Sequence, residues 1–137
     1  MCLIAAGLED SNWQLQPWRY LLETALGLSR HGYCVTLVSD RPGASPAGTL
    51  RGLPLVHLPT LRSLPGRQNR LLHNTLEALH PEMILWNVGL TSLLYQDFEA
   101  YLPARQVGIF TNPLYSTRQL LRIGPLRLFR YRDLTAV

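Results

Sequence analysis

Short apolar runs alternate along this chain with segments whose apolar residues recur at helical spacing. The strand-like runs lie at residues 2–6, 34–40, 55–59, 83–87 and 106–110, and the first of them is apolar throughout. A run that is apolar throughout is typical of a strand buried on both faces. Strands that alternate with helices favour a mainly parallel sheet with helices on both faces. We therefore predict an α/β fold in which residues 1–137 form a single, doubly wound Rossmann-like domain.

The helical segments have recognisable boundaries. Pro17 stands at a favoured first helical position, and Gly32 ends that helix. Its apolar stripe consists of Trp18, Leu21, Leu22, Ala25 and Leu26. A second helix is predicted over residues 67–80, stopped by Pro81, with three inward residues, namely Leu72, Leu76 and Leu79. Further helical patterns cover residues 90–98 and parts of 116–132, whereas residues 41–54 are rich in proline and glycine and predict a loop.

Right-handed crossovers limit how these strands can be arranged. Numbered along the chain, the five strands are predicted in the order 3-2-1-4-5. The strand at residues 2–6 then lies in the centre of the sheet, beside the strand at residues 83–86. The last letters, "DLTAV", resemble the start of a sixth strand. Because a domain rarely ends as a strand begins, we expect this chain to be part of a longer protein.

The sequence carries no targeting or membrane-spanning pattern that we recognise. No apolar run is long enough to cross a bilayer, and "MCLIAAG" lacks the basic start of a signal peptide. We therefore expect a cytoplasmic location. Cys2 and Cys34 both fall in apolar runs and form no CxxC motif, so both are predicted to be buried, reduced thiols.

Positive charge is concentrated towards the C-terminus. The net charge is +4, and all thirteen basic residues are arginine. Residues 105–137 hold six arginines and one acid, which indicates phosphate, nucleic acid or an anionic membrane as a partner. No recognisable nucleic-acid motif is present, so we expect no nucleic-acid partner. Arginines at 118, 122, 127 and 130 mix with apolar residues, which fits either a peripheral membrane contact or a helix packed on the sheet.

Ligands of doubly wound sheets bind beyond the carboxyl ends of the strands, where the winding reverses. Loops at residues 7–16, 87–91 and 111–117 are predicted to meet there. In the first loop, Gly7 is followed by Leu8, Glu9 and Asp10 instead of G-x-G-x-x-G. A P-loop motif needs a lysine, and the chain has none. These absences argue against an NAD enzyme and against a P-loop NTPase.

Four polar side chains near these strand ends are candidate ligand-binding groups. Glu9 and Asp10 are able to bind sugar hydroxyls or to act as a base, or they belong to a solvated acidic loop. Asn87 and Asn112 each follow an apolar strand. An asparagine there offers both donors and acceptors to a polar ligand, or serves a turn or helix cap.

Other reactive residues form no convincing catalytic pattern. His73, Glu77 and His80 share one helical face, as metal ligands do, but no fourth ligand is suggested and a solvated face is favoured. No G-x-S-x-G elbow or other nucleophile arrangement is present. We therefore assign no catalytic residue and no metal site.

Several stretches together resemble one enzyme family. "PWRYLLETALGLSRHGYCVTLVSD" resembles the glycosyltransferase pattern "L..rGHeVtvvt", with His31-Gly32-Tyr33 in place of the Gly-His pair. "HPEMILWNVGLTSLL" is similar to "kPDvih.h...a.l", and "QVGIFTNPLYS" to "pvv.t.H". "YRDLTAV" is similar to "..aD.vi.vS". The family is that of the group-1, or family-4, retaining glycosyltransferases, which have two Rossmann-like lobes in the GT-B fold.

The resemblance implies that this chain is the N-terminal, acceptor-binding lobe of such an enzyme. The nucleotide-sugar donor would be held mainly by a C-terminal lobe, and the mechanism would need no metal and no cofactor. Gly7, Asn87 and Asn112 would line the cleft, and the acceptor would be a carbohydrate or lipid-linked. The family commonly has paired glycines in the first loop, which this sequence lacks. It also commonly has a histidine near position 112, where this sequence has Asn112.

Two functions therefore remain open at this point. The first is a glycosyltransferase that is active when full length, of which the isolated chain is expected to be inactive. The second is a stand-alone flavodoxin-like or receiver-like module that binds a ligand or partner. A receiver domain needs an acidic pocket at the first strand and a lysine after the fifth, and neither is found here.

Overall fold

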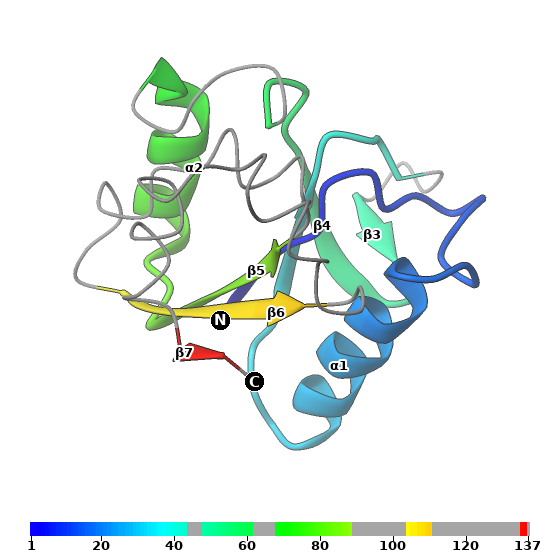
Figure 1. The fold of residues 1–137 in the computed structure, drawn as a ribbon. Helices are drawn as coiled ribbons and strands as arrows, with labels where there is room; N and C mark the ends of the chain where they lie inside the picture. Colours follow the sequence, from blue (N-terminus) through cyan, green and yellow to red (C-terminus); the bar gives the residue numbers. More distant parts are fainter. Residues whose placement is uncertain (44–47, 62–67, 89–103, 111–134, 137) are drawn as a thin grey trace, which may run out of the picture.

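The computed structural model describes residues 1–43, 48–61, 68–88, 104–110 and 135–136, and these form one sheet of seven strands with two helices (Figure 1). The sheet order is β3-β4-β2-β1-β5-β6-β7. The strands are β1 Cys2–Ile4, β2 Thr36–Ser39, β3 Thr49–Leu50, β4 Leu53–His57, β5 Met83–Val88, β6 Arg105–Phe110 and β7 Thr135–Ala136, and the helices are α1 Trp18–Arg30 and α2 Arg70–Leu79.

The predicted topology is confirmed. The five predicted strands are β1, β2, β4, β5 and β6, and they pair in parallel in the predicted order. β1 is central and lies beside β5, with Leu3 opposite Leu85. The predicted sixth strand is β7, which pairs in parallel with β6. The chain therefore has the α/β, doubly wound, mainly parallel Rossmann-like fold that the alternating pattern indicates.

Two hydrophobic cores cover the two faces of the sheet, because successive side chains of a strand point to opposite faces. Cys2 and Ile4 of β1 pack with α2, whereas Leu3 of β1 and Ala5, directly after the strand, pack with α1. The core under α1 includes Leu21, Leu22, Ala25, Leu37, Leu55 and Leu85. The core under α2 includes Val38, Leu58, Leu72, Leu76, Ile84 and Trp86. The apolar strands β1 and β2 are thus buried on both faces, whereas Pro54 and His57 of β4 are exposed.

Helix α1 follows the predicted stripe closely. Leu21, Leu22 and Ala25 are buried, and Trp18 and Leu26 pack partly buried beside them. Pro17 precedes the first helical residue as the N-cap instead of occupying the first turn. The helix ends at Arg30, and Gly32 takes a φ of +86°, a conformation that glycine adopts at little cost.

Helix α2 begins later than predicted, at Arg70 instead of residue 67. Asn69 is buried and caps the helix, because its Oδ1 accepts a hydrogen bond of 3.1 Å from the backbone N–H of Leu72. His80, in the left-handed conformation, ends the helix before Pro81. The predicted inward residues Leu72 and Leu76 are buried, and Leu79 packs against the same core.

A small hairpin lies where a loop was predicted. β3 pairs antiparallel with β4, and the two strands are joined by Arg51 and Gly52, with φ values of +51° and +85°. Positive φ at both central residues gives a tight turn whose twist matches that of the strands. The guanidinium of Arg51 lies 4.5 Å from the ring centre of Trp13, so the hairpin also contacts the loop after β1.

The two cysteines lie in different environments. Cys2 is fully buried, as predicted, but Cys34 is exposed, because β2 begins two residues after it. Within the described ranges, no helix is both long and apolar enough to cross a bilayer. The predicted helix at residues 90–98, the loop at 111–117 and the arginine-rich stretch at 116–132 lie outside the described residues.

Candidate functional site

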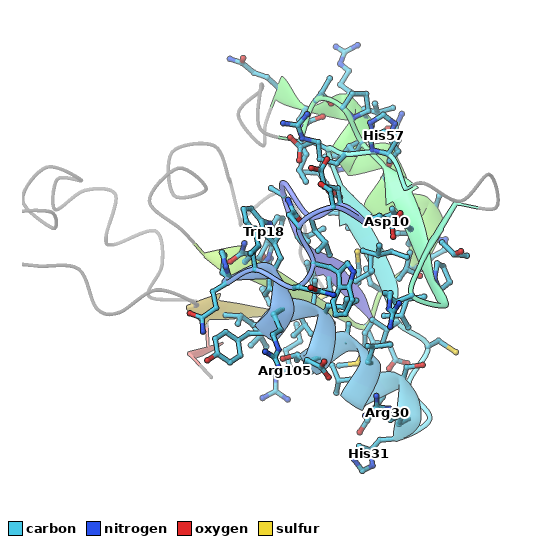
Figure 2. The ribbon with its side chains drawn as sticks, turned by 90° about the vertical axis from the view of Figure 1, so that its right-hand side faces the viewer. Asp10, Trp18, Arg30, His31, His57 and Arg105 are labelled. Atoms are coloured by element: carbon cyan, nitrogen blue, oxygen red, sulfur yellow. The ribbon has the colours of Figure 1, made fainter. Side chains whose placement is uncertain are left out.

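The winding of the sheet reverses between β1 and β5. From β1 the chain passes through α1 to β2 on one side, and from β4 it passes through α2 to β5 on the other. The carboxyl ends of β1 and β5 therefore border the position where doubly wound folds bind ligands. In Figure 2 the labelled residues Asp10, Trp18 and His57 lie in the upper half of the view, whereas Arg30 and His31 at the other end of α1 lie at the bottom.

The strand register brings a row of residues together at this edge. Ser39 of β2 is opposite His57 of β4, and Ile4 of β1 lies between Val38 and Trp86. One residue further along, Ala5, Ser39 and Asn87 are neighbours. By alternation they face the side of the sheet that α1 covers, since Ala5 belongs to the core under that helix.

The loop after β1 turns sharply at Gly7. Gly7 has a φ of +83° and is buried, so only glycine fits there without backbone strain. Its N–H donates to Oδ1 of Asp40, the residue after β2, across 2.6 Å. This charge-assisted bond ties the loop to the end of the neighbouring strand.

The other backbone groups at the start of this loop also have protein partners. The carbonyl of Gly7 accepts from Nδ2 of Asn12 at 2.7 Å, and Oδ1 of Asn12 accepts from the N–H of Glu9 at 3.0 Å. Ser39 Oγ donates to the carbonyl of Leu8 at 2.8 Å. Trp18 Nε1 donates to the carbonyl of Ala6 at 3.2 Å. The loop is thus held in one shape by its own Asn12 and by side chains of α1 and of the end of β2.

Two carboxylates stand on this rigid loop. Glu9 is half-buried, and its Oε1 accepts a hydrogen bond of 2.5 Å from Ser11 Oγ. Asp10 is exposed. An ionised carboxylate can accept hydrogen bonds but cannot donate them. Their chemistry therefore suits hydroxyl, ammonium or amide groups of a ligand and disfavours anions.

The structure brings most of the predicted site residues to one edge. Gly7, Glu9 and Asp10 share the loop after β1, and Asn87 lies on the adjacent strand β5, buried with 9% of its surface exposed. Asn112 lies outside the described residues. Gly7 contributes its conformation and its bond to Asp40, so the candidate ligand-binding groups are the side chains.

Three polar residues at the same edge were missed by the sequence analysis. Ser39 and Asp40 close the loop after β1, and His57 is exposed at the end of β4. The signal was present, since the runs "TLVSD" and "LVH" both change from apolar to polar where the strands end. The rule that selected Asn87 would have selected these residues as well.

Other reactive groups lie away from this edge. Cys2 begins β1 at the opposite end, and burial raises the pKa of its thiol from 9.0 to about 12, so it stays protonated. On α2, Nδ1 of His73 lies 3.6 Å from Oε1 of Glu77, whereas His80 is the left-handed cap beyond the helix. No group of three possible metal ligands occurs in the part of the chain that the structure describes.

Comparison of the chain with protein-family models, with curated proteins and with solved structures finds no match.

Proposed function

We propose that this chain is the acceptor-binding lobe of a GT-B glycosyltransferase that uses a nucleotide-sugar donor. The observation that carries the proposal is the loop after β1, which presents Glu9 and Asp10 on a preformed backbone at the switch point of the sheet. The family resemblance of the sequence supports the same assignment. In this proposal a second lobe completes the enzyme, and the chain alone transfers no sugar.

The residues at this edge would bind and orient a carbohydrate acceptor. Glu9 and Asp10 would accept hydrogen bonds from its hydroxyl groups, and Asn87, on the adjacent strand β5, would contribute its amide to the same edge. Holding the acceptor in one orientation supplies a large part of the rate enhancement in a two-substrate reaction. Charge on the departing diphosphate would be stabilised by the second lobe, without a metal in this lobe.

The order of the strands favours this proposal over the stand-alone alternative. Flavodoxin-like and receiver-like domains have the order 2-1-3-4-5, whereas the parallel strands here run 3-2-1-4-5-6 in chain order. The latter is the order of Rossmann-like domains, and the resemblance implies a Rossmann-like fold for both lobes of the enzyme. A flavodoxin-like or receiver-like module is therefore the weaker of the two functions.

We further propose a cytoplasmic location with a peripheral contact to anionic membranes, and a lipid-linked acceptor. The support is the arginine-rich sequence between residues 118 and 130. Co-sedimentation with anionic and neutral vesicles tests it. Binding that is stronger to anionic vesicles and weakened by salt is expected, and equal, salt-insensitive binding to both would contradict it.

A panel of uncharged oligosaccharides displayed on an array tests the acceptor site. The wild-type chain is expected to bind a subset of the panel. Glu9→Ala and Asp10→Ala should each weaken that binding about tenfold or more, because each removes charge-assisted hydrogen bonds to hydroxyls. Glu77→Ala, an exposed carboxylate on α2, is the matched control and should leave binding unchanged. No binding to any glycan, or equal loss in all three variants, would count against the proposal.

A further inference from the structure

We propose that Asp40 makes the loop after β1 select uncharged, polyhydroxylated ligands over phosphates, by occupying the backbone amide that a phosphate would need. This inference rests on the proposed function for the identity of the preferred ligand. The exclusion of phosphate rests on the geometry of the loop alone, and the experiment below tests that exclusion separately.

Phosphate-binding lobes of this fold use bare backbone N–H groups in the turn after the first strand. In this chain the N–H of Gly7 donates to Oδ1 of Asp40 at 2.6 Å. Asp40 stands directly after β2, where dinucleotide-binding lobes place the acid that binds a ribose hydroxyl. Here that carboxylate is bound inside the protein and itself takes the place of an anionic ligand.

The next two amides of the loop are also bound within the protein. The N–H of Leu8 donates to the carbonyl of Ala5 at 3.0 Å, and that of Glu9 donates to Oδ1 of Asn12 at 3.0 Å. A phosphate would therefore have to displace three protein acceptors in succession. It would also approach the carboxylates of Glu9 and Asp10, which repel it.

Asp40 is fixed in its position by its neighbours in β2. The carbonyl of Ser39 accepts from the N–H of Leu58 at 2.7 Å, and Ser39 Oγ donates to the carbonyl of Leu8. The N–H of Arg41 in turn donates to Ser39 Oγ at 3.2 Å. These bonds hold the backbone on both sides of Asp40, so its carboxylate reaches the Gly7 amide from a fixed point at the end of β2.

This selectivity would let the lobe bind one substrate of the proposed reaction, the sugar acceptor, and exclude the diphosphate of the other. The uncharged sugar that receives the transferred group can donate hydrogen bonds from its hydroxyls to the carboxylates of Glu9 and Asp10 at the edge of the sheet. The diphosphate of the donor finds no free amide between Gly7 and Glu9 and must be bound by groups elsewhere. Asp40 is thus a positioning residue that acts through the backbone of the loop.

Titration of the ¹⁵N-labelled chain with inorganic pyrophosphate, followed through its amide NMR signals, tests the exclusion. In the wild-type chain the signals of Gly7, Leu8 and Glu9 should not move. Asp40→Ala frees the Gly7 amide and should give a saturable shift there, with pyrophosphate binding at least about tenfold tighter than in the wild type. Asp40→Asn keeps an oxygen acceptor at the same place, so the Gly7 amide should stay bound and should not respond to pyrophosphate.

Two results would overturn the inference. One is a saturable shift of the Gly7 amide in the wild-type chain, which needs no variant to fold. The other is an Asp40→Ala chain that keeps its dispersed spectrum but still does not respond to pyrophosphate. Neither result depends on glycan binding, so failure of the acceptor-lobe proposal alone would leave the outcome of this titration unchanged.

Discussion

The backbone N–H of Gly7 donates to Oδ1 of Asp40 across 2.6 Å, and this bond joins the loop after β1 to the end of β2. The two residues are 33 positions apart in the chain. They meet because β1 and β2 are parallel neighbours, so that both strands end at the same edge of the sheet. The bond fixes the loop that carries Glu9 and Asp10, and it removes the first amide that an anion would bind.

Replacing Gly7 with alanine should destabilise the protein by about 1–2 kcal/mol, since its φ of +83° is unfavourable for any residue with a Cβ. Urea denaturation followed by circular dichroism measures the change. Gly27→Ala is the matched control. An added Cβ at Gly27 meets nothing within 4 Å, and alanine favours the interior of α1, so this variant should be stabilised by about 0.5–1 kcal/mol. Equal effects of the two substitutions would contradict the positive φ of Gly7.

Replacing Asn69 with alanine should cost about 2 kcal/mol, because a buried side chain that caps α2 is lost. Its Oδ1 accepts from the N–H of Leu72, and its Nδ2 donates to the carbonyl of Thr60 at 3.0 Å. Asn74→Ala, on the exposed face of the same helix, is the control and should be neutral or slightly stabilising. Thermal and urea denaturation of both variants compare them. A neutral Asn69→Ala variant would show that this residue does not cap the helix.

The buried thiol of Cys2 makes stability depend on pH in the alkaline range. Burial raises its pKa from 9.0 to about 12, and the nearby N-terminal ammonium lowers it by a smaller amount. At pH values between 9.0 and about 12, the thiol of Cys2 loses its proton in the unfolded chain but keeps it in the folded chain. The unfolded state then binds fewer protons, so stability falls as the pH rises, by at most about 1.4 kcal/mol per pH unit. Below pH 9 the contribution of this thiol is fully present.

The comparison of wild type with Cys2→Ala isolates this effect. Stability measured in urea at several pH values above 9 should decline more steeply in the wild type than in the variant. Every other ionisable group is shared by the two proteins and cancels in the difference. Native alkylation should label the exposed Cys34 and leave Cys2 unmodified. Parallel pH profiles, or rapid labelling of Cys2, would contradict the buried position of this thiol.

The central part of the fold could be predicted because its signals are local and strong. The run from Cys2 to Ile4 is apolar at every position, and such a run is stable only where both faces are covered. The stripe of α1 is equally clear. The right-handedness of crossovers then leaves few arrangements, of which the observed order is one.

The sequence patterns failed where structure depends on contacts distant in the chain or on very short elements. The two residues of β3 are too few to show a periodicity, and Arg51-Gly52 is a less familiar turn signal than Asn-Gly. The bond between Gly7 and Asp40 joins two separate loops, so no local pattern indicates it. Cys34 lies in an apolar run but precedes β2, and exposure there depends on where the strand begins.

Titration calorimetry of the isolated chain with nucleotide sugars and with uncharged glycosides tests the central claim most directly. If this chain is an acceptor-binding lobe, the glycosides that bind on the array should give saturable heat, with an affinity that Asp10→Ala weakens about tenfold or more. UDP and GDP sugars should bind weakly or not at all, since the amides from Gly7 to Glu9 already have protein partners. Micromolar, one-to-one binding of a nucleotide sugar would contradict the account and would identify the chain as a self-sufficient nucleotide-binding domain.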